Sequence, residues 1–288
     1  MQIIVSGLIF GCIYALAALG LVLIYKTTEV VNFAHGEIAM VTTFVSYVFL
    51  TRYGLPYTLS LVLSLLFATL FGMLVYLLFM KRIHSAPHIN QVVLTLGLFM
   101  VFNGFAGITW GYETVSYPEA ISGSPFQFGS IFISGNEFFM VGLTIVLMLL
   151  FFTLFRFTKI GLAMRSAAQD KMASELMGVK VSGVFMTAWA IGSALGGISG
   201  IMTAPITFLS PNMMGEVLIF AFAGAVLGGF NSLPGTVVGG LMIGVFQNLI
   251  SFYLSPDLKI VFVFLLIVLV LYVRPQGIFG GAKMVKKV

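Results

Sequence analysis

Residues 260–273 read IVFVFLLIVLVLYV, a run of fourteen residues that would be apolar on every face of a helix. The run lacks the polar alternation that a transmembrane β-strand requires. A helix needs roughly 20 such residues to cross a hydrocarbon core of about 30 Å. Uncharged stretches recur at residues 1–25, 38–51, 53–80, 89–112, 138–155, 181–215 and 217–256. The sequence therefore predicts an all-α integral membrane protein, a polytopic helical bundle of eight or nine transmembrane segments forming one domain over residues 1–288.

The composition agrees with lipid as the solvent, because 60% of the residues are hydrophobic and only 8% are charged. The net charge of +5 does not indicate a nucleic-acid partner, since the Lys and Arg residues fall between apolar stretches and form no basic patch. A signal peptide at residues 1–25 is an alternative, but that stretch lacks a basic beginning. The lone cysteine, Cys12, excludes an intrachain disulfide.

The distribution of positive charge predicts the orientation. With the N-terminus outside and the C-terminus in the cytoplasm, 12 of the 14 Lys and Arg residues fall in inner segments, as the positive-inside rule requires. The loop at residues 113–137 contains three acidic residues and no Lys or Arg, so it is expected to be extracytoplasmic.

One long apolar stretch, residues 217–256, is interrupted by NSLPG at residues 231–235. Its first part is either a full span or a re-entrant half-helix, which gives nine or eight crossings. Irregular backbone at membrane depth is tolerated only beside protein or a water-filled cavity, so the interruption is expected near a pathway. Small residues spaced by four predict close helix packing at Gly7/Gly11, Gly192/Gly196/Gly200, Gly224/Gly228, Gly235/Gly239 and Gly240/Gly244.

The most charged segment, residues 156–181, reads RFTKIGLAMRSAAQDKMASELMGVKV. Residues 162–177 are good helix formers, and Gly178 stands where a glycine ends a helix, so one helix of about four turns is expected. Met164, Ala168, Met172 and Leu176 would form an apolar stripe along it. Such a helix would dock into a groove on a partner protein or lie on the bilayer surface.

Two motifs carry a family resemblance. GLAMRSAAQD, followed by ASELMGV, resembles the coupling loop of permeases from branched-chain amino acid ABC importers. NFAHGE at residues 32–37 resembles the signature near the start of that family's second span. The resemblance implies that residues 158–180 are a cytoplasmic loop meeting an ATPase, through Gly161, Arg165, Ala168, Gln169, Asp170, Glu175 and Gly178.

The resemblance also implies a division of labour. The chain would be a multi-pass permease of the bacterial inner membrane, in a heterodimer with a related second permease, beside two ATP-binding subunits and an extracytoplasmic solute-binding protein. The sequence has no G-x-x-x-x-G-K-[ST] phosphate loop, so ATP and Mg²⁺ belong to the partner subunits, and this chain is expected to bind no cofactor or metal and to catalyse no reaction. The implied substrates are leucine, isoleucine and valine; urea or short amides are the alternative.

Polar residues inside the spans are candidates for the substrate pathway. If residues 32–37 are helical, Asn32 and His35 share a face and Glu37 lies on another. Glu37 would accept from the ammonium group of an amino acid, or would brace the start of its helix. Glu216 would face an outer vestibule, whereas Asn103, Gln247 and Asn248 are either interhelical hydrogen bonds or ligands.

Two other classes of protein compete with this prediction. Gly197-Ile-Ser-Gly200 matches the G-x-S-G tetrad of intramembrane serine proteases, but every histidine of the chain, His35, His84 and His88, precedes it, whereas that family's base follows. An ion-coupled secondary transporter would also have broken helices and a midplane carboxylate. It would not need a long charged cytoplasmic helix, which favours the ATP-driven importer.

Overall fold

The computed structural model describes residues 1–84, 86–128 and 131–280, and these are almost entirely helical. The long helices are α1 (Gln2–Thr28), α2 (His35–Thr51), α3 (Tyr57–Val75), α5 (His88–Trp110), α6 (Gly135–Phe157), α9 (Val181–Thr207), α10 (Met214–Gly228), α11 (Leu233–Tyr253) and α12 (Lys259–Val273). The short elements are the π-helix η1 (Tyr76–Met80), α4 (Lys81–Ile83), α7 (Lys159–Gln169), α8 (Lys171–Leu176) and the 3₁₀ turn η2 (Pro256–Leu258). Strands β1 (Phe126–Phe128) and β2 (Ile131–Ile133) form an antiparallel hairpin.

The bundle has the character of a membrane protein. Seven helices in the described part of the chain are long and apolar enough to cross a bilayer. The remaining long helices are shorter, with 17 residues in α2 and 15 in α10. The expected polytopic α-helical bundle is confirmed.

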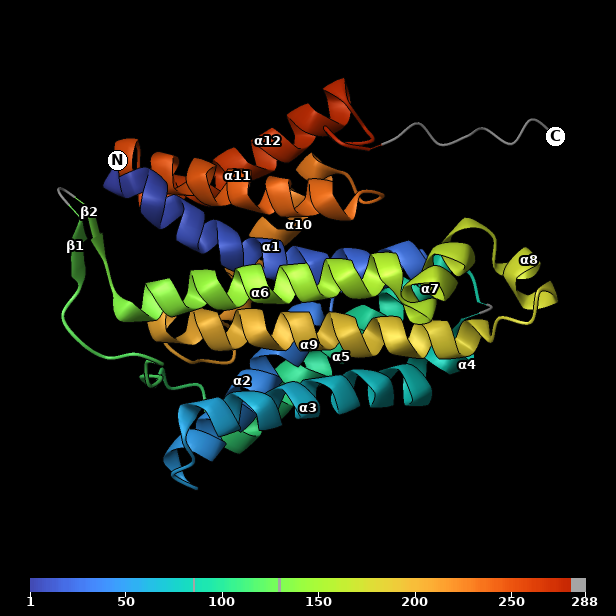
Figure 1. Cartoon of the computed structure of the whole chain (residues 1–288), viewed down its shortest axis with the longest axis horizontal. Helices are drawn as coiled ribbons and strands as arrows, with labels where there is room; N and C mark the ends of the chain where they lie inside the picture. The colour runs from blue at the N-terminus through green and yellow to red at the C-terminus, as the bar shows by residue number, and fades with distance from the viewer. Residues whose placement is uncertain (85, 129–130, 281–288) are drawn as a thin grey trace.

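The two ends of the bundle differ in charge. The helices run along its long axis, with the β1–β2 hairpin at one end and α7 and α8 at the other (Figure 1), and we call these the hairpin end and the α8 end. Of the Lys and Arg residues that the structure describes, only Arg52 and Lys259 lie at the hairpin end. The α8 end holds the other Lys and Arg residues of the described chain: Lys26, Lys81, Arg82, Arg156, Lys159, Arg165, Lys171, Lys180 and Arg274.

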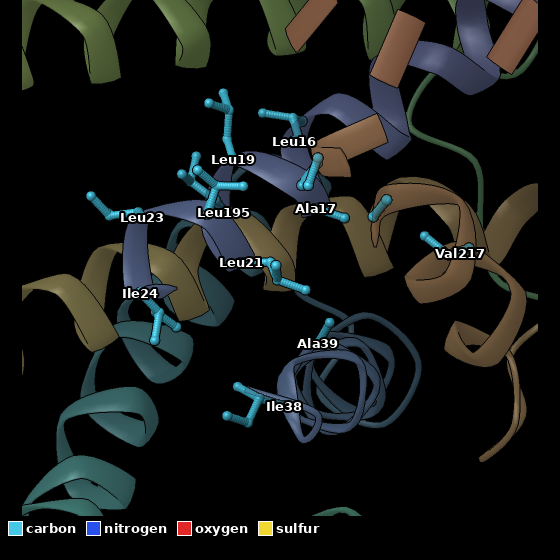
Figure 2. Packing of buried hydrophobic residues seen from close by; sticks show 14 of the residues in the cluster. Leu16, Ala17, Leu19, Leu21, Leu23, Ile24, Ile38, Ala39, Leu195 and Val217 are labelled. Carbon is cyan, nitrogen blue, oxygen red and sulfur yellow. The ribbon is translucent and has the colours of Figure 1, made fainter. Parts of the chain in front are cut away.

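The core is built around α1. In the most apolar 18-residue segment of α1, 89% of the residues are buried, and in that of α9 78% are buried. The corresponding share in the other long apolar helices is 11–44%. Figure 2 shows the side chains that surround α1, among them Ile38 of α2, Leu195 of α9 and Val217 of α10. Helices α3, α5, α6 and α12 pack outside and leave apolar side chains exposed, as lipid contact requires.

Glycines let α1 approach α11 at backbone distance, as the spacing of small residues predicts. A Cβ atom at Gly11 would lie 2.8 Å from the Cα of Leu241, and one at Gly7 would lie 2.8 Å from the Cα of Val245. Backbone atoms cannot give way as a flexible side chain can. The α1–α11 contact therefore excludes any side chain at these positions.

The interruption at residues 231–235 lies at the α8 end, and its expected position near a pathway stays a prediction. Helix α10 ends at Gly228, Gly229 turns with φ +98°, and the Ser232 hydroxyl accepts from the amide of Gly235 at 3.1 Å to cap α11. Lys26 Nζ donates to the carbonyl of Asn231 at 2.9 Å, which places this turn among the charges of that end. Helix α10 has 15 residues and begins beside the start of α2, where a Cβ atom at Gly36 would lie 3.4 Å from Cβ of Met214. The full span and the re-entrant half-helix both stay predictions.

The α1–α2 connection is irregular backbone that lies inside the bundle. A Cβ atom at Gly20 would lie 2.8 Å from Cε1 of His35, so α2 begins about two turns back from the end of α1. Residues 29–34 thus fold back into the bundle. The Thr95 hydroxyl of α5 lies beside their backbone: it accepts from the amide of Phe33 at 3.3 Å and donates to the carbonyl of Val92 at 2.8 Å, with the carbonyl of Val31 3.4 Å away. This start at depth explains why α2 needs only 17 residues.

Adding a methyl group at the α1–α11 contact should destabilise the bundle. We expect Gly11→Ala to lower the apparent melting temperature and the yield of monodisperse protein in detergent, since overpacking against backbone costs about 1–3 kcal/mol. The matched control is Gly97→Ala on α5, where a Cβ atom meets nothing within 4 Å. The control should be neutral or slightly stabilising, because alanine favours helix over glycine. Equal melting temperatures for the two variants would contradict the close contact.

Candidate functional site

A buried carboxylate lies between α2 and α5. Glu37 is only 3% exposed, and its Oε2 accepts a hydrogen bond from Asn103 Nδ2 at 3.3 Å. The same nitrogen lies 3.1 Å from the carbonyl of Pro211 and 3.2 Å from Oδ1 of Asn212. Both acceptors belong to the connection between α9 and α10. Asn103 therefore links α2, α5 and that connection.

A cavity of about 420 Å³ opens nearby, between α1, α9, α10 and α11. We call it the hairpin-end cavity. Its polar lining consists of Tyr14, Thr203, Thr207, Asn212, Glu216, Gln247, Asn248, Ser251 and Lys259, and its apolar lining of Phe10, Ile13, Ile206, Met213 and Val217. The volume lies within the range of about 300–1,000 Å³ that is usual for small-molecule sites.

An ion pair forms part of the cavity wall. Lys259 Nζ lies 2.7 Å from Glu216 Oε2, and the two side chains are 24% and 52% exposed. The ammonium group also lies 5.9 Å from the ring centroid of Phe220. A carboxylate and an ammonium side by side, next to an apolar wall, are complementary to the two charged groups and the side chain of an amino acid.

Asn212 connects the buried carboxylate to the cavity. It lines the cavity and also lies within hydrogen-bond distance of Asn103. Five of the residues predicted for the substrate pathway are thereby brought into one polar region: Glu37, Asn103, Glu216, Gln247 and Asn248. Asn212 itself was not predicted; the signal for it was the polar S-P-N turn at residues 210–212, just after an apolar stretch.

Asn248 has a further structural role. Its Nδ2 donates to the carbonyl of Ile3 at 2.6 Å, joining α11 to the start of α1. The interhelical hydrogen bond considered for this residue is confirmed. Its position in the cavity wall makes the bond part of the site as well.

Two predicted pathway residues lie apart from this region. Asn32 precedes α2, and its Oδ1 accepts from the amide of Ala34 at 3.1 Å, so the prediction that Asn32 and His35 share a helix face is wrong. The ring of His35 is fully surrounded; Cβ atoms at Gly20 and Gly196 would each lie 2.8 Å from its Cε1. His35 thus fills the space between α1 and α9.

The described part of the loop at residues 113–137 lies at the hairpin end and is tied to the bundle at several places, including two backbone hydrogen bonds of 2.9 Å between Val115 and Leu209. Tyr117 and Ser46 share a hydrogen bond of 2.7 Å between their hydroxyl groups, and burial raises the pKa of Tyr117 above its usual value. Gln2 exchanges two hydrogen bonds of 2.9 Å with the backbone of Phe132 in β2. The N-terminus of α1 and this loop therefore form one surface.

At the opposite end, the expected four-turn helix is two helices. Asp170 has extended backbone, with φ −154° and ψ +110°, and its side chain accepts from the amide of Ala173 at 3.0 Å to cap α8. A residue that caps a new helix has non-helical backbone, so Asp170 also ends α7. Helix propensities did not predict this break. The apolar stripe is split as well: Met164 is buried, whereas Met172 is 74% exposed and Leu176 is 83% exposed.

The other coupling-loop candidates occupy defined positions in α7 and α8. A Cβ atom at Gly161 would overlap the carbonyl group of Phe155, so this turn requires glycine. Arg165 donates to the carbonyl of Arg156 at 3.0 Å. Gly178, at φ +84°, ends α8 as predicted, its amide donating to the carbonyl of Glu175 at 2.9 Å. Ala168 and Gln169 line a groove of about 340 Å³ beside the end of α1.

The comparison with protein families decides the identity of this architecture. Residues 3–271 match the family described as the branched-chain amino acid transport system permease component. The chain belongs to this permease family. The protein named high-affinity branched-chain amino acid transport system permease protein LivH, from Salmonella typhimurium, is 28% identical to the permease over 305 residues, covering 99% of this chain and 97% of that protein. The protein named BraD in Pseudomonas aeruginosa, a permease for the same transport system by name, is 26% identical with the same coverage.

The fold of the permease also has a relative among solved structures. The structure described as PsaBC from Streptococcus pneumoniae in complex with Fab contains a chain that superposes with a TM-score of 0.51. The match covers 96% of the permease and 91% of that chain at 10% sequence identity, so it concerns the fold alone.

Ser199 of the G-x-S-G tetrad donates its hydroxyl proton to the carbonyl of Gly196 at 2.7 Å. The family identifies a transport subunit, and the protease alternative is abandoned.

The Glu37–Asn103 contact predicts a measurable coupling. Asn103→Ala removes the donor from a buried carboxylate and should lower stability by about 1–3 kcal/mol. The same substitution in a Glu37→Gln background should cost less, because the neutral amide is easier to bury unpaired. Thermal denaturation of the four proteins of this double-mutant cycle in detergent would give the coupling. Additive effects would show that the contact contributes nothing.

Proposed function

We propose that this permease is the translocating subunit of an ATP-driven importer for leucine, isoleucine and valine. The observation that supports it most is the family match over residues 3–271, together with relatives named for this transport along nearly their whole length. The hairpin-end cavity adds a chemical argument, because it joins an ion pair to an apolar wall. Urea and short amides lack the two charges that this pair would match.

The orientation we propose places the hairpin end outside and the α8 end in the cytoplasm of a bacterium, across the inner membrane. The excess of Lys and Arg at the α8 end supports it through the positive-inside rule. The N-terminus and the loop at residues 113–137 would then face a solute-binding protein. The C-terminal residues 281–288, expected in the cytoplasm, lie outside the described residues.

The ATPase would be met by α7 and α8. Helix α8 exposes Met172 and Leu176, and the residue after it exposes Met177, with 74%, 83% and 85% of their surfaces accessible. Glu175 lies on the same short helix, and Gly178 ends it. An apolar face next to the charged Glu175 suits a groove on a partner protein. We propose that this partner is one of two ATP-binding subunits, which hold ATP and Mg²⁺. A related second permease would complete a heterodimer. Movement of the ATPases would reach the bundle through the α7–α8 pair.

The deciding experiment is reconstitution. The tagged permease is co-purified with the products of its neighbouring genes and tested for ATP hydrolysis and leucine uptake in proteoliposomes. We expect ATPase subunits to co-purify and uptake to require ATP. If the permease alone carries leucine down an ion gradient, it is a secondary transporter and the proposal is wrong.

Reversing one charge in α7 should uncouple the two activities. Arg165→Glu is expected to reduce uptake by at least about tenfold, since a misplaced charge at an interface costs more than ~1.4 kcal/mol. The bundle should remain folded, because the side-chain contacts of Arg165 with the carbonyl of Arg156 and the ring of Phe155 both lie at the end of the neighbouring α6 helix. The control is Lys81→Glu on α4 at the same end, which should transport normally. Full activity of Arg165→Glu would remove α7 from the coupling mechanism.

A second prediction concerns amino-acid recognition in the hairpin-end cavity. We expect Glu216 to receive the ammonium group of leucine and Lys259 its carboxylate, so Glu216→Gln and Lys259→Met should each raise the KM of uptake by about tenfold or more. The exchanged pair, Glu216→Lys with Lys259→Glu, restores an ion pair with reversed polarity. It should not restore uptake, because leucine bound in reverse would direct its side chain away from the apolar wall.

The control for this prediction is Asp257→Asn, a change of charge in η2 at the same end but outside the cavity lining. It should leave the KM unchanged. Restoration of normal uptake by the exchanged pair would mean that Glu216 and Lys259 only hold α10 to α12.

A further inference from the structure

A second cavity, at the α8 end, has a composition that the transport cycle does not explain. It has a volume of about 580 Å³ and lies between the end of α1, the end of α6, α7 and the α10–α11 turn. Three cations line it, Lys26, Arg156 and Arg165, together with Phe152, Phe155 and Leu233. We call it the basic pocket. Its lining contains no Asp or Glu among the residues that the structure describes.

Two of the three cations of the basic pocket are held close together, and the third, Arg156, has its guanidinium 5.5 Å from the ring centroid of Phe157 at the pocket's edge. Lys26 Nζ and the Arg165 guanidinium lie 5.6 and 5.8 Å from the ring centroid of the same residue, Phe155. Lys26 also donates to the carbonyl of Asn231 at 2.9 Å, and Arg165 to that of Arg156 at 3.0 Å. Carbonyl oxygens orient these groups without neutralising their charge. Like charges held together in this way repel each other, and an anion placed among them would relieve the repulsion.

The apolar side of the pocket connects it to lipid. Phe152 lies on α6, whose neighbouring Leu149 and Leu150 are 63% and 60% exposed on the surface of the bundle. A ligand with an anionic head in the pocket could therefore extend an apolar tail along α6. Arginine binds phosphate oxygens in a bidentate manner, and lysine supplies a point charge.

We propose that the basic pocket binds the phosphodiester headgroup of an anionic phospholipid, with Lys26, Arg156 and Arg165 around the phosphate and the acyl chains along α6. Free phosphate shares the same chemistry of recognition. The lipid is the occupant we argue for, because the pocket adjoins lipid-exposed apolar surface and basic pockets between transmembrane helices are suited to such headgroups. A bound lipid would connect α1, α6 and α7 to one another.

The test measures bound lipid and does not depend on transport. The full-length permease, purified in detergent, is incubated with phosphatidylglycerol or phosphatidylcholine and examined by native mass spectrometry. We expect selective retention of phosphatidylglycerol by the wild type. Lys26→Gln with Arg156→Gln should reduce that retention about tenfold or more, since two of the three cations are lost. Arg165 is left unchanged in this test, because it is proposed to act in coupling.

The matched control is Lys81→Gln with Arg82→Gln, which removes two cations from the same end outside the pocket. It should retain phosphatidylglycerol as the wild type does. Equal loss in both double variants, or equal retention of the two lipids by the wild type, would overturn the proposal.

Two further measurements separate lipid binding from binding of a free anion and from a loss of lipid caused by misfolding. Equilibrium dialysis with radiolabelled inorganic phosphate tests the other source, and binding of phosphate without retention of phosphatidylglycerol would overturn the lipid assignment. If the double variant melts early, Arg156→Gln alone is used, since the Arg156 side chain is exposed and should be replaceable without unfolding the bundle. Unchanged lipid retention in that variant would likewise contradict the proposal.

Discussion

The contact of α1 with α11 at backbone distance is the constraint on which the rest of the bundle depends. Lipid tails are as apolar as leucine, so burial of apolar surface does not drive helices together inside a membrane. Close packing must do so, and Gly7 and Gly11 allow it by leaving no side chain between α1 and α11. With α1 fixed in the centre, the helices around it are placed as well. The hairpin-end cavity lies between α1 and three of these helices, α9, α10 and α11.

The same central position of α1 governs the polar interior. Residues 29–34 fold back beside α1, and the Thr95 hydroxyl of α5 accepts a hydrogen bond from the amide of Phe33 in this segment. Glu37, in the first turn of α2, then meets Asn103 of the same α5 helix. Helix α5 therefore stabilises both irregular backbone and a carboxylate in a region where neither could face lipid. Its polar side chains link the start of α2 to the α9–α10 connection.

Much of this arrangement follows from the sequence alone, because a helix that crosses lipid must be apolar over a fixed length, and that pattern can be read directly. The helical class, the positions of the spans, the glycine contacts and Gly178 as the end of α8 were all predicted. The break at Asp170 was missed because helix propensity reports the preference of each residue and not the competition between continuing a helix and capping the next one. The fold-back at residues 29–34 was missed because it depends on Thr95, which lies far away in the chain. Asn212 joined the site for the same kind of reason, since tertiary contacts alone bring it to Asn103.

The position of His35 has a consequence for how the protein is made. The ring lies between Gly20 of α1 and Gly196 of α9, and α9 is synthesised on the order of 160 residues after α2 begins. At a translation rate of about 5–20 residues per second, the start of α2 waits on the order of ten seconds for its second neighbour. During that interval a histidine and a glutamate stand at membrane depth without their final surroundings, so α2 cannot settle in the bilayer as an independent span. Its insertion is completed by a helix from the second half of the chain, which makes membrane integration and tertiary folding a single late event.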